Sequence, residues 1–331
     1  MNARFGKIRL FIKRSVIALA VVLFVVAIAG TIYQTAATEA DQRKYPPTGV
    51  LVSVDGYKMH ISCLGEGSPT ILLDHVGGGS SLDWALIQPK LAEHTRICAY
   101  DRAGFGWSDY NPAPRTLEQQ VHELHGLLEG ANEKGPYIYV GHSYGARVAR
   151  VFAEKYPQDV VGMVLMDPGI LYDDPRYSKQ ILADYQNENK MILLSDRLAP
   201  FGLVRLLRPI FMSGPIYDFP TNAQQVNDSF AVTKQFWNSM KDQVDSQPIV
   251  FKEEYQVTSL GDIPLLVLIS AERDPVTKQA NIEMSELSTN GRYQIVDDAT
   301  HMSLVYRQKD AQVSTDGILS ILDTVRTMAV R

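Results

Sequence analysis

Ser143 has the surroundings of a catalytic nucleophile. It is the central residue of the segment 141–145, GHSYG, which follows a strand-like run, PYIYV, and precedes a helical pattern, ARVARVFAEKYP. A sharp turn between strand and helix strains the backbone at the serine and points its hydroxyl outward, while small flanking residues let the two elements approach closely. G-x-S-x-G alone is a weak pattern, and a serine that only caps the helix is the alternative. The order strand, turn and helix favours the nucleophile.

A serine hydroxyl needs a general base, and His301 is the candidate. In the chain order typical of such a turn, the base comes last, after an acid. Of the seven histidines only His301 lies C-terminal to Ser143, in the loop 297–301 that leaves the last apolar run. A histidine on a surface loop without a catalytic role is the alternative.

The acid that orients this histidine should lie at the end of a strand between the two residues. Asp274 follows the run LLVLIS in the segment 271–275 and is the expected acid. Asp167, at the end of VGMVLMD, is the competitor, because it ends the next strand-like run after the nucleophile. Either aspartate could instead cap a following helix.

An acyl-transfer site also needs backbone amides that stabilise a developing oxyanion. The amide of Tyr144, directly after the nucleophile, is one expected donor. The second is expected from Gly77, with Val76 next, in the loop 74–80, where consecutive glycines let the backbone approach a ligand. A flexible turn is the alternative for this glycine cluster. The proposed chemistry requires neither a cofactor nor a metal.

Strand-like runs alternate with helical patterns through most of the chain, which predicts an α/β fold with a mainly parallel sheet covered on both faces. A D-G turn at 55–56 joins two β-rich runs into a hairpin. Residues 116–128 place leucines and a valine on one helical face. About 95 residues, roughly 168–262, interrupt the alternation and predict a mostly helical insertion. The remaining strand-like runs are 70–74, 96–101, 137–140, 161–166, 264–269 and 292–296.

Composition indicates a folded chain and excludes several classes. The 331 residues are 45% hydrophobic and 21% charged, with a net charge of −5. Five cations lie within residues 1–14, so the rest of the chain carries 27 basic and 37 acidic residues. An acidic body argues against a nucleic-acid partner, because phosphate binding requires clustered Lys and Arg. Two cysteines exclude a disulfide-rich scaffold and a four-cysteine zinc site.

The N-terminal region predicts a membrane anchor. Residues 15–33 are almost wholly apolar, and 19 residues span about 28 Å as a helix. The basic residues 1–14 should remain in the cytoplasm, which places the rest of the chain outside. Residues 34–48 are expected as a linker and 49–331 as the catalytic domain. A cleaved signal peptide and a buried core helix are the alternatives.

The motifs together resemble the α/β-hydrolase superfamily from about Thr48 to the end. GHSYG is similar to its nucleophile turn, DHVGGGSSLDW to its oxyanion loop, ICAYDRAGFGWSD to a signature of esterases and iminopeptidase-like members, and ERDP and DDATH to its acid and histidine loops. The resemblance implies an eight-stranded, mostly parallel sheet with a helical cap after the sixth strand. Serine at the turn, rather than aspartate, speaks against the dehalogenase and epoxide hydrolase branches. His75-Val76-Gly77 departs from the usual His-Gly-X, which leaves open which amide faces the substrate.

Two further expectations depend on this resemblance. Cys63 and Cys98 fall on strands that are neighbours in the superfamily, so they can form a disulfide if the domain is exported; two buried thiols are the alternative. The loop residue Arg102 is expected to be an architectural ion-pair partner.

The combined hypothesis is a membrane-anchored, exported serine hydrolase that cleaves a small carboxylic ester through an acyl-enzyme. An iminopeptidase-like aminopeptidase or amidase is the first alternative. It would need an acidic cap residue for the substrate amine, and the candidates are Asp184, Glu188, Glu253 and Glu254. A non-catalytic member that binds a ligand in the same pocket is the second. The apolar cap segment 191–212 predicts either packing within the lid or a surface for a hydrophobic substrate or membrane.

Overall fold

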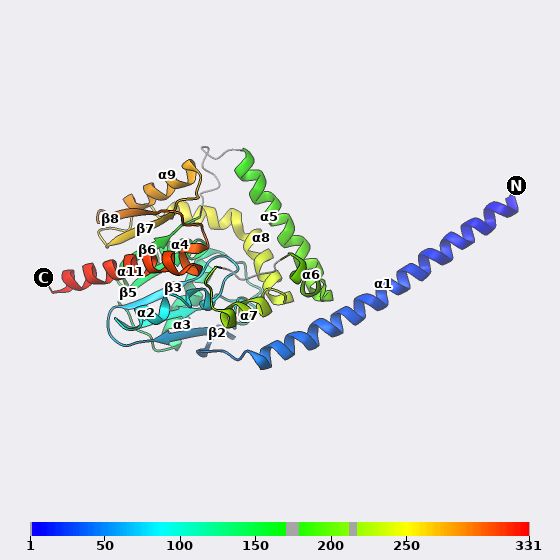
Figure 1. The fold of residues 1–331 in the computed structure, drawn as a ribbon, viewed down its shortest axis with the longest axis horizontal. Helices are drawn as coiled ribbons and strands as arrows, with labels where there is room; N and C mark the ends of the chain where they lie inside the picture. Colours follow the sequence, from blue (N-terminus) through cyan, green and yellow to red (C-terminus); the bar gives the residue numbers. More distant parts are fainter. Residues whose placement is uncertain (1, 170–178, 212–216, 331) are drawn as a thin grey trace.

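An eight-stranded sheet with the order β1-β2-β4-β3-β5-β6-β7-β8 forms the centre of the domain in the computed structural model, which describes residues 2–169, 179–211 and 217–330 (Figure 1). The hairpin β1–β2 and the pair β2–β4 are antiparallel, and all other neighbouring strands are parallel. The predicted eight-stranded, mostly parallel sheet is therefore confirmed. The strands are β1 (Val50–Val54), β2 (Tyr57–Leu64), β3 (Thr70–Asp74), β4 (Ile97–Tyr100), β5 (Tyr137–His142), β6 (Val160–Met166), β7 (Leu265–Ser270) and β8 (Gly291–Val296).

Helices cover both faces of this sheet. Leu72 and Tyr139 pack with α3 (Leu117–Gly130) and α4 (Tyr144–Lys155) on one face, whereas Leu73 and Val140 pack with α11 (Gln308–Ala329) on the other. Successive residues of a central strand are therefore both buried and apolar, as expected when a parallel sheet is enclosed. The shorter helices are η1 (Ser81–Trp84), α2 (Gln88–Leu91), α9 (Pro275–Met284), η3 (Ser285–Leu287) and α10 (Ser303–Tyr306).

Between β6 and β7 the described residues form a helical cap without a strand. Glu254 of α8 accepts hydrogen bonds from Arg147 and Arg150 of α4, and all three side chains are buried. These ion pairs attach the cap to the body of the domain, because separating them would leave charges unpaired in a dry environment. The cap helices are α5 (Lys179–Leu198), η2 (Ala199–Phe201), α6 (Leu203–Phe211), α7 (Thr221–Phe230) and α8 (Lys234–Gln256).

A single long helix, α1 (Asn2–Lys44), projects from the domain (Figure 1). Its length and apolar composition would allow it to cross a membrane. Residues 34–44, expected as part of a linker, continue the helix. The segment TAATEADQRK contains mostly good helix formers, and the helix ends shortly before Pro46-Pro47, which cannot extend it. The linker is therefore limited to the few residues before β1.

Cys63 of β2 and Cys98 of β4 lie opposite each other in the sheet and are joined by a disulfide. In the described part of the chain, one group of His, Cys, Asp and Glu side chains lies close enough together to hold a metal ion, and it consists of the two cysteines and Glu133. The two sulfurs are bonded to each other, and Arg96 donates to both carboxylate oxygens of Glu133. The geometry therefore fits a disulfide beside an ion pair rather than a metal site.

Candidate active site

Ser143 occupies a strained turn between β5 and α4. Its φ of 54° and ψ of −109° lie in a region that non-glycine residues seldom adopt. A Cβ on Gly141 would lie 2.5 Å from the carbonyl carbon of Gly145, and one on Gly145 would lie 2.5 Å from the carbonyl oxygen of Asp74. Glycine is therefore required at both positions, because the turn brings the helix against the strands. The predicted strand, turn and helix are present.

His301 lies beside this turn, in the loop after β8. The imidazole of His142 lies 4.7 Å from that of His301, measured between ring centroids, and His142 Nε2 donates to the carbonyl oxygen of His301 at 3.0 Å. Burial, with a smaller contribution from His301, lowers the pKa of His142 to about 3. His142 is therefore a neutral imidazole at pH 7. Because His142 directly precedes Ser143, its hydrogen bond holds the His301 loop beside the serine.

The acid beside His301 is Asp167, which directly follows β6. Its Oδ2 lies 2.6 Å from His301 Nδ1, and its carboxylate is completely buried. Ser270 supplies two further donors, its backbone amide and its hydroxyl, each at 3.1 Å. Burial opposes ionisation of Asp167, but the hydrogen bond from His301 and the charge of Arg273 outweigh it and lower the Asp167 pKa to about 2. Asp167 is therefore a carboxylate at neutral pH.

Asp274 does not contact His301, and the expected position of the acid is corrected to Asp167. Asp274 is the N-cap of α9: its carboxylate accepts the amides of Val276 and Thr277 at 3.0 and 3.1 Å and the Thr277 hydroxyl. The turn after β7 thus directs Asp274 towards the first turn of α9. Chain order alone left two strand ends as candidates for the acid. The adjacency of β6 to β5, the strand that leads into Ser143, is the observation that favours Asp167.

Arg273 is a residue of this site that the sequence analysis did not single out. Its Nε donates to Asp167 Oδ2 at 2.8 Å, and its Nη2 lies 2.6 Å from His301 Nδ1. Arginine offers only donors, so the acceptor for an Nδ1 proton is Asp167. That tautomer leaves the Nε2 lone pair of His301 available for a proton from serine. Among the described residues, no hydrogen bond joins Ser143 Oγ to His301, as is common before a substrate binds.

Gly77 and Tyr144 line one cavity with Ser143, with a volume of about 230 Å³. A Cβ on Gly77 would lie 3.6 Å from the Cβ of Tyr144, so the glycine loop passes close to the start of α4. Val76 and Arg147 also line this cavity. The two residues expected to supply oxyanion amides thus lie together beside the serine.

Arg102 orients the loop that carries Gly77. This buried side chain donates to the carbonyl oxygens of His75 and Val76, each at 2.7 Å, and pairs with Asp74. In a trans peptide the N–H points opposite to the C=O, so the amides of Val76 and Gly77 point away from Arg102. The predicted architectural ion pair is present, and the same guanidinium also fixes the direction of two backbone amides.

Comparison with known proteins agrees with this fold. Residues 69–308 match the family described as alpha/beta hydrolase fold. This chain belongs to that family. YqjL of Bacillus subtilis is 40% identical over 119 residues, which are 36% of this chain and 47% of YqjL, so the chain spans about half the length of this relative.

Two solved structures share the fold. A candidate epoxide hydrolase from Pseudomonas aeruginosa has a TM-score of 0.69 at 20% identity, covering 84% of this chain and 96% of that one. A candidate lipase from Acinetobacter baumannii has a TM-score of 0.66 at 19% identity, covering 89% and 97%. At these identities the similarity establishes the hydrolase architecture and does not identify the substrate.

Proposed function

We propose that this α/β hydrolase cleaves carboxylic esters through an acyl-enzyme formed on Ser143. The observation that carries the proposal is the contact between the buried Asp167 and His301 beside the strained turn at Ser143. A carboxylate on Nδ1 fixes the tautomer in which Nε2 accepts a proton, and it stabilises the imidazolium that results. A serine that only caps a helix would not require this pair of Asp167 and His301 beside it.

The reaction proceeds in two steps. Ser143 Oγ attacks the ester carbonyl as His301 Nε2 accepts its proton, and the imidazolium then protonates the leaving alcohol. The amides of Gly77 and Tyr144 stabilise the tetrahedral oxyanion. Water, deprotonated by His301, attacks the acyl-enzyme and releases the carboxylic acid. Neither step uses a metal or a cofactor.

Labelling by a fluorophosphonate probe tests this proposal, because only an activated serine forms the phosphonyl adduct. Wild-type protein should be labelled and should hydrolyse p-nitrophenyl esters, and Ser143→Ala should lose both properties. Ser320→Ala, a change on α11, is the matched control. Labelling of Ser143→Ala, or esterase activity that survives in it, would contradict the proposal. So would a wild-type protein with neither property, which would favour a non-catalytic ligand-binding role.

An aminopeptidase is a second candidate because Glu188 lines the same cavity as Ser143. An acid at this place could hold a substrate ammonium group. Of the other cap acids, Glu254 pairs with two arginines and Glu253 accepts the amide of Leu117 at 2.6 Å, whereas the side chain of Asp184 lies outside the described residues. Faster cleavage of aminoacyl arylamides than of esters, abolished by Glu188→Gln, would favour this candidate over the esterase.

We further infer that α1 anchors the domain on the extracytoplasmic side of a membrane. The five cations before residue 15 and the apolar residues 15–33 support this orientation. A reporter fused after Arg331 should behave as exported, and the protein should remain in membranes after an alkaline carbonate wash. Soluble protein with a new N-terminus between Ala29 and Ala40 would instead indicate a cleaved signal peptide.

A further inference from the structure

The apolar part of α1 packs directly against the cap. A Cβ on Gly30 would lie 2.4 Å from the carbonyl oxygen of Phe201, so only glycine allows α1 to approach the η2 backbone this closely. Gly202, which follows η2, faces the ring of Tyr33. Because residues 15–33 form the apolar run, these contacts place η2 and the start of α6 at the level where that run ends.

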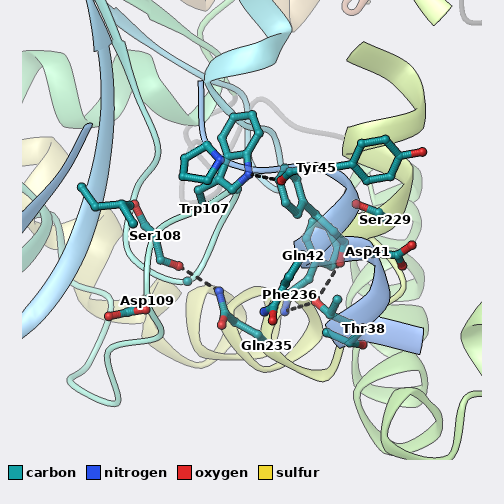
Figure 2. Close-up of a pocket in the computed structure, with 16 residues that line it drawn as sticks. Thr38, Asp41, Gln42, Tyr45, Trp107, Ser108, Asp109, Ser229, Gln235 and Phe236 are labelled. Atoms are coloured by element: carbon teal, nitrogen blue, oxygen red, sulfur yellow. Dashed lines mark hydrogen bonds between the residues drawn. The ribbon is translucent and has the colours of Figure 1, made fainter. Parts of the chain in front are cut away.

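Polar contacts hold the next turns of α1 against the domain. Gln34 Nε2 donates to the carbonyl oxygen of Val232 at 2.8 Å, and Arg205 of α6 binds Asp41 at 2.6 Å. At the end of the helix, Trp107 Nε1 donates to the carbonyl oxygen of Tyr45 at 2.9 Å, beside a cavity between α1 and the domain (Figure 2). The helix is thus attached from Gly30 to its C-terminus, which fixes the orientation of the cap relative to α1.

The outer side of the cap carries exposed apolar side chains at this level. Figure 1 shows α5 crossing the direction of α1, with α6 between α5 and α1. On α6, Ile210 is 70% exposed and Leu206 is 58% exposed. A set of this kind on a folded surface usually marks a contact with a partner or a membrane. We define the apolar cap face as Met191 and Leu194 of α5 with Leu203, Leu206, Leu207 and Ile210 of α6.

The charges of the cap fit a lipid surface. Arg205 and Arg208 of α6 pair with Asp41 and Asp228, so their charges turn towards the protein while the leucines of the helix remain outside. On α5, Lys190 and Arg197 are exposed near Met191 and Leu194. Apolar side chains flanked by cations are typical of a helix that lies in the interface of a bilayer containing anionic lipids.

A cavity connects this region with the oxyanion loop. It has a volume of about 310 Å³, begins at Gly77 and Val76, which also line the cavity of Ser143, and extends to Arg208 of α6. Its aromatic lining residues are Phe219, Phe230, Phe236 and Tyr306. A long acyl chain could therefore reach from Ser143 towards the cap helix beside the anchor.

We propose that the apolar cap face lies on the bilayer crossed by α1 and that the substrate is an acyl ester of a membrane lipid. This inference rests on the proposed esterase function and specifies its substrate. The acyl chain enters beside α6 and its ester reaches Ser143, which displaces the alcohol of the lipid and forms the acyl-enzyme. Water then releases the fatty acid. The lipid surface, rather than a protein, is the chosen occupant because the face is continuous with a helix that would cross the membrane.

Contact between the apolar cap face and the bilayer can be measured without an activity assay. Full-length Ile210→Cys, labelled with an environment-sensitive fluorophore, is reconstituted into vesicles of phosphatidylcholine and phosphatidylglycerol; the native cysteines are already paired. The label should emit at shorter wavelength and be quenched several-fold more by doxyl-labelled lipid than a label at Met328→Cys, on the exposed end of α11. Quenching of Ile210 by aqueous iodide but not by doxyl lipid would overturn the proposal. Protection from both quenchers would also overturn it, by showing that a protein covers the face.

The substrate is tested with dioleoylglycerol in the same vesicles and with water-soluble p-nitrophenyl butyrate. The double variant Leu206→Glu/Ile210→Glu should cleave the bilayer ester at least about tenfold more slowly, since burial of one such side chain contributes more than the free energy of a tenfold change. Its rate on p-nitrophenyl butyrate should match wild type, as should both rates of Met328→Glu. Equal loss on both esters would overturn the membrane proposal and leave the esterase proposal intact. Absence of both activities in wild type would overturn the esterase proposal itself.

Discussion

Asp167 Oδ2 and His301 Nδ1 lie 2.6 Å apart although 134 residues separate them in the chain. The backbone around Asp167 also places this acid close to the nucleophile. Asp167 has a φ of 46°, a conformation that aspartate tolerates better than most residues, and the amide of Ser143 donates to the carbonyl oxygen of Met166 at 2.9 Å. The acid and the nucleophile are therefore held by neighbouring strands of one sheet.

Asp167→Asn should reduce esterase kcat far more than Asp274→Asn. An asparagine at 167 stabilises the wrong imidazole tautomer, which costs about 10⁴-fold in kcat in the chymotrypsin example. Asp274→Asn should change kcat little, because asparagine can also cap α9. Steady-state kinetics with p-nitrophenyl butyrate measure both. A larger loss for Asp274→Asn would return the acid to Asp274 and require a different arrangement of the loop after β7.

The sequence predicted the sheet and the turn at Ser143 because local rules determine them. Alternating apolar runs identify enclosed strands, and the glycines around Ser143 are required by close approach within a few residues. The choice between Asp167 and Asp274 depends on which strand end His301 approaches, a long-range property that no local pattern encodes. Arg273 was missed for the same reason, since its partners lie directly after β6 and in the loop after β8.

The length of α1 illustrates a different limit. Apolar composition identified residues 15–33, but residues 34–44 are polar and were expected as a linker. They are helical in the structure because they have high helix propensity and because Arg205, from the cap, binds Asp41. A contact with a residue 164 positions away could not be inferred from the segment itself.

Arg102→Lys should lower kcat of the esterase with a smaller change in KM. One ammonium group cannot bind Asp74 and both loop carbonyls in the planar geometry of the guanidinium, so the Gly77 amide would lose its fixed direction. Loss of one oxyanion donor costs about 10²–10³ in kcat. Arg96→Lys, which alters a partly exposed ion pair, is the control. A proportional rise in KM with unchanged kcat would indicate that Arg102 acts on substrate binding instead.

Gly30→Val should detach α1 from the cap. The added side chain would collide with the Phe201 backbone, which cannot move as a flexible side chain could. Ala29→Val places the same side chain on the exposed side of the helix and is the matched control. Limited proteolysis should cut the cap of Gly30→Val several-fold faster than that of wild type or Ala29→Val. Equal rates for all three proteins would show that the packing of α1 on η2 does not restrain the cap.

Cys63→Ser/Cys98→Ser should unfold at a lower temperature than wild type. The disulfide spans a separation of 35 residues, and closing a loop of about this length stabilises a fold by roughly 3 to 4 kcal/mol in the chain-entropy model. Denatured, unreduced wild-type protein from its native membrane should show no titratable thiol. Two free thiols would contradict both the bridge and the export of the domain.

Asp83 should make the free energy of unfolding depend on pH between about 4 and 7. Burial, only partly offset by hydrogen bonds from Tyr306 and Ser80, raises its pKa to about 7. An unfolded aspartate ionises near pH 4, so above that pH the folded state keeps a proton that the unfolded state has lost, and stability falls as pH rises, levelling off above 7. The opposite holds for buried His142, whose lowered pKa makes its contribution to the free energy of unfolding increase with pH up to about 6.5.

The contributions of Asp83 and His142 are separated by the difference in unfolding temperature between wild type and Asp83→Asn, measured at pH 5 and pH 8, with the exposed Asp297→Asn as control. Relative to wild type, Asp83→Asn should be more stable at pH 8 than at pH 5, by on the order of 1.4 kcal/mol for each pH unit between 5 and the folded pKa of about 7. A difference that does not change with pH would show that Asp83 is ionised in the folded protein throughout this range.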